Sequence, residues 1–140
     1  MIRKAFLDSD VILDVATARQ SHVEMSKAVL ALIENGFALG VMSANSVTNI
    51  YYILRKLGSG DLARSFIGSV LKYVSVASVD HDDIVRALES KFIDFEDGVQ
   101  NYCASSNQCD LIITRNIDDY RWSELRVVEP REFVALYQNI

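Results

Sequence analysis

Short apolar runs alternate along the chain with longer segments in which apolar residues recur every three or four positions. The runs cover residues 5–7, 37–42, 74–77, 111–113 and 127–128, and polar residues border them. This pattern is typical of buried strands that alternate with amphipathic helices. Such an order favours parallel strands joined by right-handed crossovers. We therefore expect an α/β fold: a three-layer α/β/α sandwich with a central, mostly parallel sheet of four to five strands.

Capping residues mark where the predicted helices begin and end. Ser21 and Glu24 have the spacing of a capping box, and Asn35-Gly36 supplies the left-handed end of that helix. Later helix starts are predicted at four N-cap residues and one proline: Ser43, Ser59, Asp80, Asp94 and Pro130. No linker rich in proline, glycine or serine interrupts the pattern, so we expect one domain over residues 1–140.

Composition narrows the class of protein. Of the 140 residues, 50% are hydrophobic and 24% are charged, which excludes a disordered chain. No apolar run reaches the roughly 18–20 residues of a membrane span, and the first apolar stretch is too short for a signal peptide. Cys103 and Cys109 match no zinc-site spacing, so we expect buried free thiols. These features predict a cytoplasmic protein with no membrane contact.

The charge balance is acidic, with 19 acids against 14 bases and a net charge of −5. This balance argues against a protein that coats duplex nucleic acid through a basic face. It does not exclude an enzyme that meets nucleic acid through a metal ion. Aspartate outnumbers glutamate by 12 to 7. Because aspartate favours caps, turns and metal sites, the positions of the aspartates carry the most information.

Many of these aspartates are predicted to lie at one edge of the sheet. In parallel α/β sheets, ligands bind at the carboxyl ends of the strands. Polar residues follow the first strand and the strand over 111–113, and two more lie on one face of the helix between them: Asp8, Asp10, Asn116, Asp118, Asp119, Asp94 and Asp97. Carboxylates brought together repel one another unless a cation neutralises them. Their oxygens suit Mg²⁺ or Mn²⁺, so the pattern indicates a divalent metal site.

Each acid also has a purely structural interpretation. Asp94 and Asp97 can cap a helix, and Asp118 and Asp119 can be turn residues. Asp14 is expected to be a solvated helix residue. Asp8 is harder to explain structurally, because an acid directly after a buried strand is costly without a partner. Motifs for dinucleotides, for P-loop phosphate binding and for serine hydrolases are absent from the sequence.

Three blocks of the sequence resemble PIN domains. Residues 6–14 resemble their opening, in which a strand ends in Asp-x-Asn/Asp followed by two hydrophobic residues. Residues 94–100, Asp-Phe-Glu-Asp-Gly-Val-Gln, resemble their central Asp-x-x-Asp-Ala-hydrophobic-Gln stretch. Residues 109–120 are similar to their closing Thr-Arg-Asn/Asp-x-x-Asp-Phe/Tyr segment. The blocks occur in the family's order and spacing, and the resemblance covers essentially the whole chain.

The resemblance implies a ribonuclease that depends on Mg²⁺ or Mn²⁺. The family includes VapC-type toxins held by antitoxin proteins, and its members commonly form homodimers, so RNA, an antitoxin and a second copy are the implied partners. By position, Asp8 matches the first acid, Asp97 the acid of the central helix with Asp94 as its helper, and Asn116 and Asp119 the last block. The same motifs imply that Ser43, Thr114 and Arg115 bind substrate.

Two departures from the family pattern concern the acids. Asn49 stands where the family usually has a glutamate, and Asn116 stands where it has an aspartate. An amide offers a neutral oxygen, so the metal would bind more weakly unless Asp10 and Asp119 compensate. We predict that Asp8, Asp97, Asn49 and Asn116 are catalytic. The predicted metal ligands are Asp8, Asp97, Asp94, Asp119 and Asp10. The alternative is a non-catalytic PIN-like module that binds nucleic acid or protein.

Overall fold

A computed structural model of the chain describes residues 2–138. Strands and helices alternate, as the hydrophobic pattern predicts. In chain order they are β1 (Lys4–Leu7), α1 (Ser9–Ala16), α2 (Val23–Glu34), β2 (Leu39–Ser43), α3 (Ala44–Leu57), α4 (Gly60–Val70), β3 (Val74–Ala77), α5 (His81–Glu89), α6 (Phe95–Ser106), β4 (Leu111–Ile113), the 3-10 helix η1 (Ile117–Tyr120), β5 (Arg126–Val128) and α7 (Pro130–Ala135).

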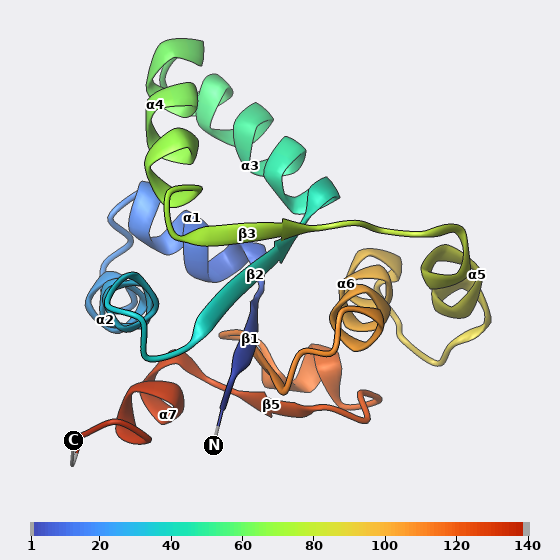
Figure 1. Cartoon of the computed structure of the whole chain (residues 1–140). Coiled ribbons are helices and arrows are strands. Elements are labelled where there is room, and N and C mark those ends of the chain that lie inside the picture. The colour runs from blue at the N-terminus through green and yellow to red at the C-terminus, as the bar shows by residue number, and fades with distance from the viewer. Residues whose placement is uncertain (1, 139–140) are drawn as a thin grey trace.

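The five strands form one parallel sheet in the order β3-β2-β1-β4-β5. β1 is the central strand and pairs with β2 on one side and β4 on the other. Figure 1 shows α1, α2 and α7 on one face of the sheet and α5 and α6 on the other, while α3 and α4 lie together beside β3. The predicted three-layer α/β/α sandwich is confirmed. Its sheet is wholly parallel, so the carboxyl ends of all five strands meet at one edge.

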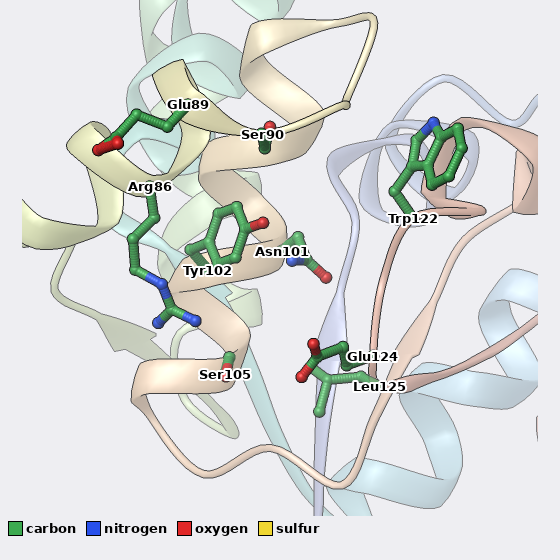
Figure 2. Close-up of a pocket in the computed structure, with 9 residues that line it drawn as sticks. All are labelled: Arg86, Glu89, Ser90, Asn101, Tyr102, Ser105, Trp122, Glu124 and Leu125. Carbon is green, nitrogen blue, oxygen red and sulfur yellow. The ribbon is translucent and has the colours of Figure 1, made fainter.

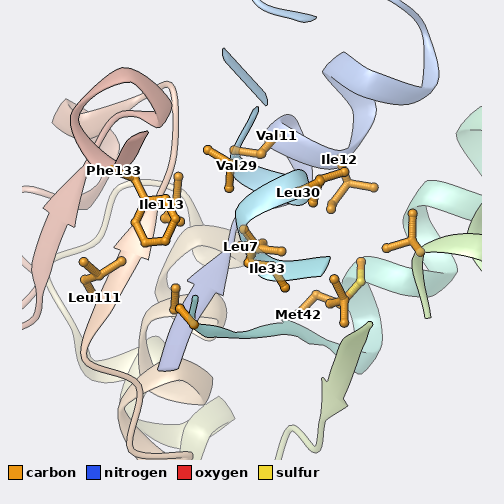
Figure 3. Packing of buried hydrophobic residues seen from close by; sticks show 14 of the residues in the cluster. Leu7, Val11, Ile12, Val29, Leu30, Ile33, Met42, Leu111, Ile113 and Phe133 are labelled. Atoms are coloured by element: carbon orange, nitrogen blue, oxygen red, sulfur yellow. The ribbon is translucent and has the colours of Figure 1, made fainter. Parts of the chain in front are cut away.

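Two hydrophobic cores lie on the two faces of the sheet, because successive strand residues point to opposite faces. Ala5 and Leu7 of β1 belong to the larger core, and Phe6 belongs to the smaller one. The larger core packs the sheet against α1, α2 and α7, as Figure 3 shows for its buried aliphatic residues and Phe133. The smaller core contains Cys103 and Cys109, whose thiols are buried and free, as predicted.

Two predicted boundaries are wrong. The expected capping box does not form, because Ser21 has a left-handed backbone (φ 72°) and α2 begins after His22 instead. A capping residue needs an extended backbone. The second strand begins at Leu39, not at Phe37. Phe37 leaves the sheet because its ring packs edge-on against Tyr137, with the ring centroids 5.7 Å apart.

The predicted N-caps at Ser43 and Ser59 are confirmed, because each side chain accepts a hydrogen bond from the first turn of its helix. Within residues 2–138, no helix combines the length and the apolar character that crossing a membrane requires.

Candidate functional site

Asp8 occupies the carboxyl end of the central strand and is the N-cap residue of α1. Only 7% of it is exposed. Oδ2 of Asp8 accepts a hydrogen bond from Oγ1 of Thr114 (2.8 Å), and Oδ1 accepts one from Nε2 of Gln100 (3.3 Å). Burial nevertheless raises the pKa of Asp8, because the charged form loses its hydration. Asp8 is therefore an acid whose negative charge is only partly compensated.

Gln100 of α6 connects Asp8 to the end of β2. Its Oε1 accepts hydrogen bonds from the hydroxyls of Ser43 and Ser46, both at 2.8 Å. With its carbonyl oxygen held in this way, the amide nitrogen of Gln100 is directed at Asp8. Gln100, Ser43 and Ser46 are all fully buried. This network fixes the position of the Asp8 carboxylate from the side of α6.

Asp10 is held by the segment that follows β4. Its Oδ2 accepts hydrogen bonds from the backbone N–H of Arg115 (3.2 Å) and from Nδ2 of Asn116 (2.9 Å). Oγ1 of Thr114 lies 3.2 Å from the same oxygen, but its single proton can serve only Asp8 or Asp10 at one time. Burial, and then the negative charge of Asp8, raises the pKa of Asp10 to about 7. An aspartate in place of Asn116 would add a further negative charge beside this pair.

The side chain of Arg115 pairs with Asp14. Nε of Arg115 lies 2.5 Å from Oδ2 of Asp14, and Arg19 lies 3.7 Å from the other oxygen. Asp14 is fully buried, so the expectation of a solvated side chain is wrong. The ion pair compensates its burial. Substrate contact by Ser43, Thr114 and Arg115 stays a prediction.

The first turn of α6 brings two more acids to this edge. Asp94 is the N-cap residue, and its Oδ1 accepts a hydrogen bond from the backbone N–H of Asp97 (3.2 Å), so its structural interpretation is confirmed. The side chain of Asp97 is half-buried. Burial raises the pKa of Asp97 to about 7, with further contributions from the negative charges of Asp8, Asp94, Asp119 and Glu96. Acids from β1, α6 and η1 thus act on one another electrostatically.

Beside Asp97 the surface is hollowed into an acidic cavity of about 330 Å³. Four carboxylates contribute to its lining, from the start of α6 and from η1: Asp94, Asp97, Asp118 and Asp119. Arg121 and Trp122 complete one side of it. Asp118 and Asp119 are also turn residues of η1, as their structural interpretation predicts. The acids face solvent here, where a substrate can reach them.

Three residues of this region are not among the predicted site residues. Gln100 lies three positions after Asp97 and so on the same side of the helix, and it occupies the glutamine position of the PIN-like block over residues 94–100. Glu96 accepts a hydrogen bond from Nδ2 of Asn49 (3.3 Å), a contact between α6 and α3 that no spacing predicts. Tyr120 is 1% exposed, and no group among residues 2–138 hydrogen-bonds its hydroxyl. Burial and the charges of Asp8, Asp97 and Asp10 raise its pKa.

The donor set fits a hydrated Mg²⁺ or Mn²⁺ ion. Within the described residues, no three histidine, cysteine, aspartate or glutamate side chains converge closely enough to hold an ion directly. Mg²⁺ keeps several waters and binds through one or two carboxylates, so direct convergence of three is not required. The buried Oδ1 of Asp10 has no hydrogen-bond partner among residues 2–138. Burial and then the neighbouring carboxylates raise the pKa values of Asp10 and Asp97 to about 7, and a bound cation would favour their charged forms.

Solved structures share this fold at low sequence identity. VapBC2 from Rickettsia felis, bound to a DNA fragment from its promoter, is 13% identical, with 90% of this chain and 98% of that chain covered and a TM-score of 0.72. FitAcB from Neisseria gonorrhoeae is 19% identical, with 91% and 98% covered and a TM-score of 0.70. VapC20 from Mycobacterium tuberculosis, a sarcin-ricin loop cleaving toxin, is 14% identical, with 87% and 98% covered and a TM-score of 0.66.

No curated protein sequence matches the chain. A PIN domain family model, however, matches residues 4–118, which is most of the chain. The three sequence blocks, the parallel sheet and the acids at its carboxyl edge agree with this match, and the chain belongs to the PIN domain family.

Proposed function

We propose that the chain is a metal-dependent endoribonuclease that hydrolyses phosphodiester bonds of RNA with Mg²⁺ or Mn²⁺. The observation that carries this proposal is the acidic cavity at the carboxyl edge of the sheet, where Asp97 and three further carboxylates from the start of α6 and from η1 converge. Family membership and the fold similarity to a sarcin-ricin loop cleaving toxin support it. Such a cluster of negative charge is stable when a cation neutralises it.

Some residues of the site would bind the cation, and others hold those residues in position by hydrogen bonds. Asp8 and Asp97 would hold the cation, with Asp94, Asp119 and Asp10 completing the negative environment. When bound, a divalent ion lowers the pKa of water and stabilises charge on phosphoryl oxygens. Gln100 and Thr114 orient Asp8 by hydrogen bonds. Asn116 orients Asp10 in the same way.

Glu96 would supply the carboxylate that position 49 lacks. The amide of Asn49 donates to Oε1 of Glu96, so a negative charge from α6 stands beside the α3 position where PIN domains usually have a glutamate. Glu96 also contributes to the raised pKa of Asp97. In this arrangement Asn49 positions Glu96, and the charge lost from α3 is replaced from α6.

The test of the function is cleavage of a single-stranded RNA by purified protein with Mn²⁺. We expect Asp8→Asn and Asp97→Asn each to lower the cleavage rate about 100-fold or more, the effect typical of removing one group that stabilises transition-state charge. Asp61→Asn, an exposed acid of α4, makes the same chemical change elsewhere and should leave the rate unchanged. Parent-like rates in both site variants would refute the proposal.

The alternative function is a non-catalytic module that binds nucleic acid or protein. The neutral amides Asn49 and Asn116 favour it, because both replace acids of the family pattern. It predicts that the parent protein cleaves no RNA with either metal. A calorimetric titration with Mn²⁺ separates the two functions, since the ribonuclease requires metal binding that Asp97→Asn weakens.

A pair of variants tests the role of Glu96. We expect Glu96→Gln to weaken Mn²⁺ binding and to slow cleavage, because it removes a carboxylate from the site. Adding Asn49→Glu to that variant should restore both, since the charge returns to the α3 side. Glu24→Gln, on the exposed side of α2, is the matched control. Unchanged metal binding in Glu96→Gln would show that Glu96 is not part of the site.

We also propose protein partners for this chain. Several structures with the same fold are toxin-antitoxin complexes, including VapBC from Salmonella typhimurium and a toxin-antitoxin complex from Klebsiella pneumoniae. We therefore infer an antitoxin protein as one partner. A second copy of the chain is the other, and the exposed apolar side chains of α3 and α4 are its proposed contact surface.

A further inference from the structure

A second pocket lies one helical turn along α6 from Asp97. Its volume is about 260 Å³, below the roughly 300–1,000 Å³ of sites for drug-sized ligands. It opens between α5, α6 and the segment after η1, as Figure 2 shows. Trp122 lines this pocket and also the acidic cavity that contains Asp97. The two spaces are therefore neighbours that share Trp122.

Asn101 is the unexplained residue of this pocket. It lies four positions after Asp97, on the same side of α6. Only 4% of it is exposed, yet its Oδ1 has no hydrogen-bond partner among residues 2–138. A buried carbonyl oxygen without a partner costs stability, so such a group is a candidate for ligand binding. Figure 2 shows Asn101 and Glu124 projecting into the space between α6 and the segment after η1.

Tyr102, Trp122 and Arg86 also line the pocket, and further cations lie against the ring of Trp122. Arg86 lies over the ring of Tyr102, with Cζ 4.5 Å from the ring centroid. Nζ of Lys91 and Cζ of Arg121 lie 5.0 and 5.7 Å from the centroid of Trp122. Lys91 and Arg121 are both exposed, so a base that stacks on Trp122 can displace them from the ring. The displaced cations can then pair with the phosphate of the same nucleotide. The pocket itself is lined by one cation, Arg86, and by the carboxylates of Glu89 and Glu124, while Lys91 and Arg121 add positive charge beside Trp122.

We propose that this pocket binds one base of a single-stranded RNA whose scissile phosphate lies in the neighbouring acidic site. The inference rests on the proposed ribonuclease function. Single-stranded RNA is recognised by stacking of its bases on aromatic rings and guanidinium planes and by hydrogen bonds to base edges. Trp122, Tyr102 and Arg86 provide the stacking surfaces, and Lys91 and Arg121 attract the phosphate.

The polar side chains of Asn101 and Glu124 determine which base the pocket prefers. The Asn101 amide offers one donor and one acceptor, a pattern that matches adenine. The carboxylate of Glu124 only accepts, so it favours a base with an exocyclic amino group. Uracil lacks such a group. The pocket is therefore expected to prefer adenine over uracil.

The test uses Trp122 as its own reporter, because it is the only tryptophan of the chain. In EDTA, 5′-AMP should quench its fluorescence saturably, UMP more weakly, and ribose 5-phosphate not at all. Asn101→Ala should weaken AMP binding about tenfold, the effect of losing one pair of base-edge hydrogen bonds. Gln20→Ala, an exposed amide between α1 and α2, is the matched control and should bind as the parent does.

Equal quenching by AMP and ribose 5-phosphate, or parent-like AMP binding by Asn101→Ala, would overturn the proposal. Arg86→Gln, at an exposed position of α5, provides a second variant that should also bind AMP more weakly, whatever the stability of Asn101→Ala. The assay contains no metal, so failure of RNA cleavage does not affect it. Conversely, normal RNA cleavage by both pocket variants together with loss of cleavage in Asp97→Asn would leave the ribonuclease standing and remove the base pocket.

Discussion

Gln100 supports Asp8 only because two serine hydroxyls support Gln100. Replacing Gln100 with leucine would leave Ser43, Ser46 and Asp8 each short of a buried partner. We expect Gln100→Leu to lower the free energy of unfolding by about 1–3 kcal/mol, the usual cost of an unsatisfied buried polar group. Urea denaturation measures it, with Gln20→Leu as the exposed control. An unchanged midpoint would mean that the network contributes nothing to stability.

The raised pKa values at the site make stability depend on pH. Asp10 and Asp97 have pKa values of about 7 in the folded protein against the usual 3.8, so the folded state binds protons more tightly than the unfolded state. Their contribution to stability is therefore complete below about pH 4 and is lost as the pH rises through about 7. We expect the melting temperature in EDTA to fall between pH 5 and pH 8.

Asp10→Asn should flatten that profile, because an amide does not titrate, whereas Asp61→Asn should not. Mn²⁺ should raise the melting temperature most at pH 8, where the carboxylates are charged. A parent profile that is flat across this range would contradict the assignment of unneutralised charge to Asp10 and Asp97.

At the scale of the elements, α2 packs so closely on β2 that Gly40 has no room for a side chain. A Cβ at Gly40 would lie 2.8 Å from Cγ2 and 2.9 Å from Cδ1 of Ile33. We expect Gly40→Ala to destabilise the protein by about 1–3 kcal/mol, the typical cost of overpacking a core. Thermal unfolding measures it. Adding Ile33→Ala removes the clashing atoms, so the double variant should lose less than the sum of the two single changes.

Elements and their caps were predictable where the signal is local. Ser43 and Ser59 cap their helices as predicted, because a cap bonds to backbone only three residues away. Phe37 was misplaced because its position depends on Tyr137, far along the chain. The central position of β1 in the sheet likewise depends on pairings between strands, which the hydrophobic periodicity does not encode.

The same division applies to the site. Asp8, Asp94 and Asp97 could be found from the sequence, because the end of a strand and the start of a helix are local features. The contact of Asn49 with Glu96 spans 47 positions, and that of Gln100 with Asp8 spans 92. No spacing predicts the contact of Asn49 with Glu96. The block over residues 94–100 includes Gln100 but does not show that it donates to Asp8, so these pairings emerge only from the folded arrangement.

At the scale of the whole molecule, α3 and α4 leave an apolar surface uncovered. Leu57 and Leu62 are 70% and 67% exposed, beside an apolar groove of about 390 Å³ that Leu54 and Phe66 help to line. Exposed apolar patches of this kind mark interaction sites. We expect the purified protein to sediment as a dimer at micromolar concentration and Leu57→Asp with Leu62→Asp to sediment as a monomer. A monomeric parent would assign this surface to another partner.

The position of Asp8 at the end of the first strand has a consequence for protein synthesis. Asp8 is synthesised before its donors Gln100 and Thr114, which follow 92 and 106 positions later. At about 5–20 residues per second, the nascent chain exists for seconds with its first acid unsupported. The carboxylate cluster can therefore assemble only after the segment over residues 94–119 has been synthesised and has folded against β1.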